Sequence, residues 1–217
     1  MHANTISTAK AFRFTGAASL VLGISTVLLA SLAYAPGHPD FSIFDTYLSD
    51  IGDTPGWPQI LFNTGALLAA PLRMVVLVLF AFRLRDYIGK QAPFEALLLT
   101  LGVLSTLGTV LMTAVPFSVA PSVHKGGIGL YFLGVVFLQA LVGFKELGIK
   151  NLPRVLPGLS FSIVACYLVF FALFVLYQTG AAGRSTPVFW EWMCFFSSMA
   201  WLAGHSVILG KDETPAK

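Results

Sequence analysis

A short segment of this chain gathers acidic side chains, which could bind a cation or exchange protons. The chain has only ten Asp and Glu residues in 217, and four of them fall between positions 40 and 53, with no Lys or Arg among them. Carboxylates are ligands for divalent cations, and a carboxylate beside a histidine can exchange protons near neutral pH. The residues with these capacities are Asp40, Asp45, Asp50, Asp53, His124 and Glu191.

The composition indicates that these residues are carried by elements in a lipid bilayer. Hydrophobic residues make up 56% of the chain and charged residues 11%, with a mean hydropathy of +0.80. A soluble domain has roughly a quarter charged residues. The net charge of +3 does not indicate nucleic-acid binding, because the basic residues are scattered over short loops. We therefore expect one transmembrane domain over residues 1–217, with no nucleic-acid partner.

Six apolar segments are long enough to cross a hydrocarbon layer of about 30 Å as helices. The runs are continuous rather than alternating, which excludes a transmembrane barrel and predicts an all-α six-helix bundle. Pro71 is expected to kink the second helix, because proline removes a backbone donor. The expected helices lie near 14–35, 58–82, 94–115, 124–144, 155–178 and 188–209.

The distribution of Lys and Arg predicts the orientation of the bundle. Ten of the thirteen lie in the terminal segments or in the loops after the second and fourth helices. Lys125 and Arg184 fall on the opposite side, and Arg73 falls inside the second helix. The positive-inside rule therefore predicts that both termini are cytoplasmic and that the Asp-rich loop is external.

The first external loop is expected to contain a short amphipathic helix lying on the membrane surface. On a helix over residues 41–51, one stripe is apolar and the other side is polar, and Gly52 is well placed to end it. The apolar stripe consists of Phe41, Phe44, Leu48 and Ile51. The alternative is that the aspartates are solvated loop residues.

Arg73, Glu191 and His205 fall inside predicted membrane helices. Glu191 and His205 share one face of the last helix but are about 21 Å apart along it, so they cannot touch. His205 is more typical of a packed or interfacial histidine than of a catalytic one. Arg73 could snorkel, meet a lipid phosphate or lie near His205.

Three stretches resemble the DRAM-like family of membrane proteins, in the same order. "YLSDIGDTP…LFNTGALL" is similar to the signature after the first helix, "LGVLSTLGTV" and "VHKGGIGLYFLGVVFLQALVGF" to the third and fourth helices, and "FWEWMCFF" to the start of the last. The chain departs from the family at Leu48, where the family has isoleucine, and in its short final external loop at 179–187. The matching positions are Ser49, Asp50, Gly52, His124, Gln139, Glu191 and Trp192.

The resemblance implies a six-helix layout and a role connected with membrane lipids, because relatives act in remodelling of GPI-anchor lipids and in plasma-membrane lipid homeostasis. The compact form is typical of a prokaryotic member, for which the location would be the plasma (inner) membrane. Together with the predicted orientation, the resemblance places a rim cluster at the external side. The rim cluster consists of Asp45, Ser49, Asp50, His124, Glu191 and Trp192.

The rim cluster has three interpretations. It could be a latch, in which Asp50 and Glu191 hold basic residues and fix the loop onto the bundle. It could bind a polar headgroup or a cation. It could also be catalytic, acting on a lipid ester as acid, base or nucleophile. The basic partners of the latch would be Lys125, Arg184 and His124, and the catalytic set would be Ser49, Asp50, His124 and Glu191.

The preferred function is that of a non-enzymatic integral membrane protein that binds lipid, or a membrane-protein partner, and contributes to membrane homeostasis. The alternative is an intramembrane lipid hydrolase or acyltransferase acting at the outer leaflet. No cofactor and no metal site are expected, because the sequence has no EF-hand, HExxH or CxxC spacing.

Overall fold

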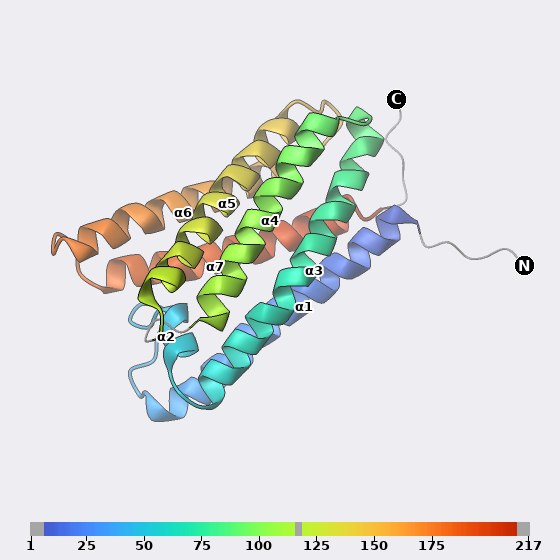
Figure 1. Ribbon diagram of the computed structural model, residues 1–217. Coiled ribbons are helices and arrows are strands. Elements are labelled where there is room, and N and C mark those ends of the chain that lie inside the picture. Colours follow the sequence, from blue (N-terminus) through green and yellow to red (C-terminus); the bar gives the residue numbers. More distant parts are fainter. Residues whose placement is uncertain (1–6, 116–118, 212–217) are drawn as a thin grey trace, which may run out of the picture.

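The computed structural model describes residues 7–115 and 119–211, and this part of the chain is all helical, without a strand (Figure 1). The prediction of an all-α fold is therefore confirmed. Two short helices, η1 and α2, follow the first long one. In chain order the helices are α1 (Thr8–Tyr34), η1 (Ala35–Gly37), α2 (Leu48–Asp53), α3 (Trp57–Ile88), α4 (Ala92–Ala114), α5 (Pro121–Leu147), α6 (Val155–Gln178) and α7 (Ser185–Ile208).

Five of the described helices are long and apolar enough to cross a membrane: α1, α3, α4, α5 and α6. The sixth predicted span corresponds to α7, which has 24 residues, as α6 does. Its Trp, Ser, Glu and His residues interrupt the apolar run, so α7 does not qualify by composition. The structure thus supports a polytopic membrane protein. It has five long apolar helices, and the more polar α7 packs among them.

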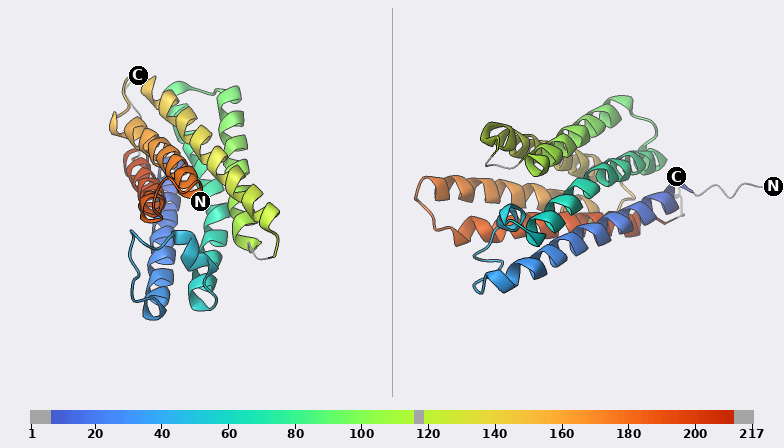
Figure 2. Two further views of the ribbon diagram at one scale, coloured as in Figure 1. Left: turned by 90° about the vertical axis from the view of Figure 1, so that its left-hand side faces the viewer. Right: turned by 60° about the horizontal axis from the view of Figure 1, so that its bottom comes forward.

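The long helices form a closed ring. Each packs against the next long helix in the chain, and α7 returns to pack against α1 (Figures 1 and 2). This closure brings the described chain ends together at one end of the bundle, which we call the terminal end (Figure 1). The opposite end, which we call the α2 end, carries α2 and the connections from α4 to α5 and from α6 to α7 (Figure 1).

Local sequence explains where several helices begin and end. Pro58, Pro93 and Pro121 occupy the first two positions of α3, α4 and α5, where a missing N–H costs nothing. Gly89 ends α3 with φ of 69°, a left-handed conformation that glycine adopts without steric cost. Pro71 lies inside α3, which continues on both sides of it.

Glycine brings α4 and α5 together at backbone contact distance. A Cβ added at Gly108 would lie 2.3 Å from the Tyr131 nitrogen, and one added at Gly134 would lie 2.8 Å from the Ser105 nitrogen. Packing rather than water drives helix association in lipid, so small residues let two helices approach. The α4–α5 pair is consequently a rigid hairpin within the ring.

A group of buried aromatic side chains lies at the terminal end, between α1, α3 and α7. Phe80 is fully buried and contacts the rings of Phe12, Trp201 and His205. Buried Arg83 donates from Nε to the Leu209 carbonyl at 2.8 Å and from a terminal nitrogen to the Lys211 carbonyl at 3.1 Å. These bonds satisfy carbonyls that the end of α7 would otherwise leave without a partner.

The expected amphipathic helix over residues 41–51 is wrong in extent and in placement. Residues 41–47 form turns and irregular structure, and the helix covers only Leu48–Asp53. Leu48 and Ile51 are buried in the protein core beside α3 and α1, instead of facing outward from the bundle. Phe44, from the same expected stripe, is about half exposed, so the stripe does not form one face. A helical projection cannot distinguish side chains that enter a protein core from those that face a membrane surface.

Candidate functional site

Two carboxylates of the rim cluster meet at the first turn of α2. Glu191, from α7, accepts a hydrogen bond from the Leu48 N–H at 2.5 Å, and the Ser49 hydroxyl faces the same carboxylate. Asp50 accepts from the Tyr47 N–H at 2.9 Å. The first N–H groups of a helix have no partner within it and attract negative charge, which explains why both carboxylates gather there.

A cation and an indole complete the connection between this loop and α7. Arg184 forms an ion pair with Asp50, and its guanidinium lies over the Tyr47 ring, 4.8 Å from the ring centre. Burial raises the pKa of the Tyr47 phenol to about 12, so Arg184 contacts a neutral ring. Buried Trp192 donates from Nε1 to the Thr46 carbonyl at 2.8 Å. Residues 46–50 are therefore tied to the start of α7 through three side chains, those of Arg184, Glu191 and Trp192.

The structure places His124 in a different setting. Its Nδ1 lies 2.9 Å from the Val115 carbonyl, and because a carbonyl only accepts, Nδ1 carries a proton. Partial burial raises the pKa of the Asp53 carboxyl, and His124 acts in the opposite direction, which places the two side chains near each other. Asp50 and Glu191 thus share the α2 turn, while His124 connects the start of α5 to the residue after α4.

The remaining acidic residues of the loop line a separate hollow at the α2 end. The Asp45 carboxylate accepts from the Ser42 hydroxyl at 2.6 Å, and His38 stacks on Tyr34 with ring centres 3.7 Å apart. The hollow has a volume of about 250 Å³. Within the described residues, no three His, Cys, Asp or Glu side chains converge as ligands for a metal. The hollow is lined by Tyr34, Gly37, His38, Pro39, Asp40, Phe41, Asp45 and Thr46.

Sequence reasoning missed a fully buried polar network near the terminal end. The His205 Nε2 lies 2.7 Å from a Glu146 carboxylate oxygen, and neither side chain is exposed. The other Glu146 oxygen accepts from the Ser160 hydroxyl at 3.1 Å, and the Trp201 indole donates to that hydroxyl at 2.9 Å. We call these four residues the inner network, which joins α5, α6 and α7. No local pattern connects positions 146, 160 and 205, so the sequence carried no signal for it.

Arg73 lies away from His205, contrary to one expectation for it. Its guanidinium donates to the Thr109 hydroxyl at 3.2 Å and lies over the Tyr131 ring, 5.5 Å from the ring centre. The Tyr131 and Tyr167 hydroxyls are 2.6 Å apart. Nearby along α5, the buried Gln139 has a carbonyl oxygen with no hydrogen-bond partner within the described structure. Arg73 therefore belongs to a polar group between α3, α4, α5 and α6.

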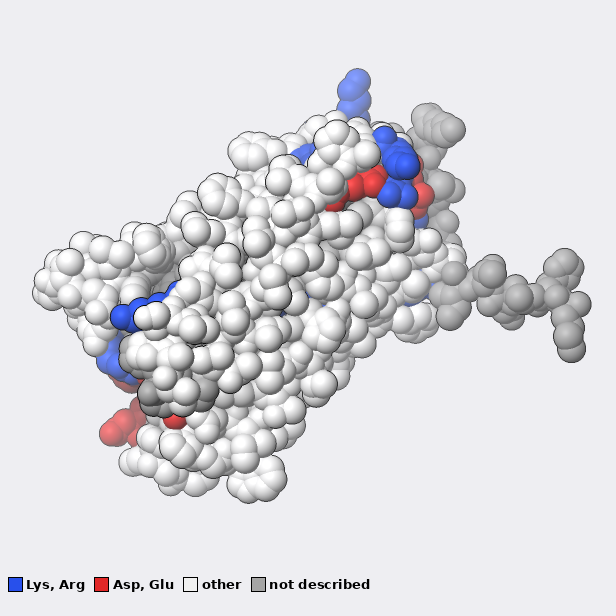
Figure 3. All heavy atoms as spheres, in the orientation of Figure 1, with Lys and Arg blue, Asp and Glu red and all other residues white. Residues whose placement is uncertain are grey.

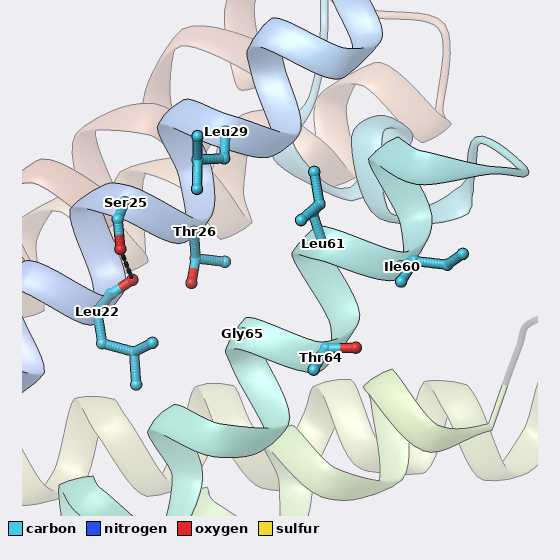
Figure 4. Close-up of a pocket in the computed structure, with 8 residues that line it drawn as sticks. All are labelled: Leu22, Ser25, Thr26, Leu29, Ile60, Leu61, Thr64 and Gly65. Atoms are coloured by element: carbon cyan, nitrogen blue, oxygen red, sulfur yellow. Dashed lines mark hydrogen bonds between the residues drawn. The ribbon is translucent and has the colours of Figure 1, made fainter.

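An apolar groove runs between α1 and α3, as Figure 4 shows. It has a volume of about 250 Å³. Leu22 and Leu29 come from α1, and Leu61 points toward that helix from α3, whereas Ile60 extends away from it (Figure 4). The hydroxyl of Ser25 donates to the Leu22 carbonyl at 3.1 Å, so this polar atom is satisfied within its own helix. The complete lining is Leu22, Ser25, Thr26, Leu29, Ile60, Leu61, Thr64 and Gly65.

The charged side chains visible on the molecule gather at its two ends, with an uncharged surface between them (Figure 3). Together with the five long apolar helices, this distribution defines a polytopic integral membrane protein. The chain belongs to the Frag1/DRAM/Sfk1/Cwh43P N-terminal domain family, whose model matches residues 12–204. The resemblance to DRAM-like proteins is thereby confirmed. Neither the curated proteins nor the solved structures include a significant match.

Proposed function

We propose that this chain is a non-enzymatic membrane protein that binds a membrane lipid and contributes to membrane lipid homeostasis. In this proposal α7 is the sixth membrane-crossing helix, the basic terminal end is cytoplasmic and the protein resides in the plasma membrane. The observation that carries the proposal is the apolar groove between α1 and α3 (Figure 4). Membership of a family with a DRAM branch supports the link to lipids.

The surroundings of the groove favour a lipid acyl chain as its occupant. Leu29 and Ile60 in its wall are about half exposed, and so is Leu28 beside it on α1. Both helices qualify as membrane spans, so the medium around these side chains is hydrocarbon. Ligand sites are concave and mostly apolar, with a few polar groups that fix orientation. The hydroxyls of Thr26 and Thr64 provide such groups here.

A close helix contact sets the floor of the groove. A Cβ added at Gly65 would lie 2.1 Å from the Thr26 hydroxyl oxygen, so α1 and α3 are separated by less than a methyl group there. The larger side chains on either side of this contact hold the helices apart. The groove is consequently a product of the helix packing and does not depend on a mobile loop.

The contacts of the rim cluster favour a structural role for it over catalysis. Asp50 and Glu191 accept backbone N–H groups of the α2 turn, so their carboxylates are engaged by the protein itself. A general base must reach the proton that it removes. Ser49 faces Glu191, whereas the hydrogen bond of His124 goes to Val115. These contacts support the latch interpretation over the lipid hydrolase or acyltransferase.

Photolabelling of the groove tests the proposal. The full chain would be reconstituted with a phospholipid that carries a diazirine in one acyl chain, irradiated, and the labelled peptides sequenced. We expect labelling of residues 22–29 and 60–65 in the wild type, and its loss in Leu29→Trp, which fills the groove. Leu28→Trp is the matched control, because Leu28 is similarly exposed but lies outside the groove lining.

Two outcomes would contradict lipid binding at this site. Labelling spread evenly over all exposed apolar side chains would mean that the groove holds only bulk lipid. Equal labelling of the groove residues in Leu29→Trp and Leu28→Trp would also mean that the groove holds only bulk lipid. Crosslinks from residues 22–29 to a second polypeptide, with no labelled lipid there, would instead indicate that the groove receives a helix of a membrane-protein partner.

A further inference from the structure

In the described part of the chain, Arg73 lacks the carboxylate partner that three other arginines of the bundle have. Arg83, Arg85 and Arg184 each form an ion pair with a carboxylate. Within residues 7–115 and 119–211, Arg73 has only neutral partners, the Thr109 hydroxyl and the Tyr131 ring. It lies inside α3, a candidate membrane span without an acidic residue between positions 57 and 85. A guanidinium stays protonated at this position, and a charge at such depth needs compensation.

The contacts of Arg73 point its charge toward the α2 end of the bundle. Side chains on a helix lean toward the helix N-terminus, which for α3 lies at the α2 end. Thr109, which receives the hydrogen bond, is in the last two turns of α4, about 7.5 Å from its final residue Ala114. Arg73 therefore points away from the terminal end.

The neighbours of Arg73 position it without neutralising it. The Thr109 hydroxyl donates to the Ser105 carbonyl and accepts from Arg73, so both of its functions are occupied. A guanidinium has five N–H donors, and this contact uses one of them. In the Tyr131–Tyr167 pair, one hydroxyl donates to the other, which leaves one further O–H donor. The group thus offers a positive charge and several donors to a partner that supplies acceptors.

We propose that Arg73, with Thr109 and the Tyr131–Tyr167 pair, is a binding site for a phosphate-type oxyanion. The planar guanidinium fits two oxygens of such a group through parallel N–H bonds, which a lysine cannot do. The oxyanion is either the phosphate of a phospholipid headgroup or a free phosphate ion. This site lies between α3, α4, α5 and α6, so it is separate from the proposed acyl-chain groove and does not depend on it.

The test uses the purified, delipidated full chain with two probes. In the first arm, native mass spectrometry measures retention of phosphatidylglycerol against diacylglycerol, which has the same acyl chains and no phosphate. In the second, thermal unfolding is followed during titration with sodium phosphate. We expect the wild type to prefer the anionic lipid or to be stabilised by phosphate, and Arg73→Gln to weaken that binding roughly tenfold or more. Arg73→Lys keeps the charge without the planar fork, and we expect an intermediate loss.

The two arms distinguish the sources of the oxyanion. Preferential retention of phosphatidylglycerol that phosphate does not displace identifies the lipid headgroup. Stabilisation by phosphate without a lipid preference identifies the free ion. Arg13→Gln, which removes an exposed basic residue near the terminal end, is the control and should leave both readouts unchanged. Leu29→Trp should also leave them unchanged, which separates this site from the groove.

Two results would overturn the oxyanion site. One is a wild type with neither lipid preference nor response to phosphate, which decides the matter even if Arg73→Gln does not fold. The other is unchanged binding in a folded Arg73→Gln, which would assign the anion to another part of the chain.

Discussion

The rim cluster and the inner network are both built from a carboxylate of one helix and partners distant in the sequence, yet they differ in what the carboxylate meets. At the α2 end, Glu191 and Asp50 bind backbone N–H groups of a short turn. Near the terminal end, Glu146 binds other side chains, and both it and His205 are fully enclosed. The first arrangement attaches a loop to the bundle, and the second holds three long helices to one another.

The difference in exposure determines how much each arrangement can contribute to stability. The side chains of Arg184 and Asp50 are 48% and 32% exposed, so solvent screens their attraction. The inner network is closed to solvent, where an unpaired charge or donor is costly. The His205 Nδ1 donates to the Trp201 carbonyl, so a second proton is shared between Nε2 and Glu146. The net charge of the Glu146–His205 pair is zero whether this proton lies on Nε2 or on the carboxylate.

Glu146→Ala should have the largest effect of any change in either region. It leaves His205 and Ser160 buried without their partner, and removing one member of a buried pair costs about 3–5 kcal/mol. The measurement is the free energy of unfolding in detergent, by denaturant titration. Glu146→Gln retains the shape and can donate an amide N–H to Nε2, so it should cost less than half as much. A loss below about 1 kcal/mol for Glu146→Ala would remove the distinction between the regions.

Glu191→Ala should have an intermediate and local effect. It leaves the Leu48 N–H without its acceptor, and a partly buried donor without a partner costs about 1–3 kcal/mol. Hydrogen exchange should show faster exchange at residues 46–53, while the helices around the inner network keep their protection. Asp45→Asn is the control, because Asp45 binds only within its own loop turn through Ser42. Uniformly faster exchange across all helices would show that the α2 turn also supports the bundle.

Trp192→Phe should cost about 1 kcal/mol, the usual contribution of one hydrogen bond. The substitution keeps an aromatic ring in the core and removes the donor to the Thr46 carbonyl. The shift in unfolding midpoint measures the effect. Trp190→Phe on the same turn of α7 is the matched control, and we expect less change from it. If both variants shift the midpoint equally, ring size rather than the hydrogen bond is responsible.

Arg184→Gln should have the smallest effect, about 0–1 kcal/mol, because the ion pair with Asp50 is exposed. The comparison predicts that this contribution fades as salt rises, since the screening length falls from about 10 Å at 0.1 M to 3 Å at 1 M. Unfolding of the wild type and the variant at both salt concentrations provides the measurement. If the difference in unfolding free energy between the wild type and the variant persists at 1 M salt, the Arg184–Asp50 pair behaves as a buried interaction does.

The sequence was sufficient to predict the helices and the family, because apolar run length is a local property. The predicted segment 155–178 coincides with α6, and the other long helices differ from prediction by a few residues at their ends. Gly52 was expected to end the short helix, but the helix includes it and ends at Asp53. A Cβ there would lie 2.8 Å from the Phe62 ring, so the glycine is needed for close packing against α3.

The partners of the polar residues could not be predicted, for two physical reasons. Glu191 binds a backbone N–H, and every residue except proline has one, so no side-chain pattern marks its partner. Glu146 and His205 are 59 positions apart and meet only because α5 and α7 both pack against α6. The grouping of Asp50 with Glu191 was anticipated from the predicted topology, but their shared partner, the first turn of α2, was not.

Because α7 packs against α1, the ring of helices is closed. The chain ends can therefore be moved to another connection without changing which helices are neighbours. Both described ends lie at the terminal end, as does the short connection between Ile88 and Ala92 (Figure 1). A circular permutant that joins residue 211 to residue 7 through a flexible linker and opens at Gly89 would therefore retain the direction of every long helix in the bundle. Reporter domains fused to the new ends would emerge beside α3 and α4 instead of beside α1 and α7, on the same side of the bilayer.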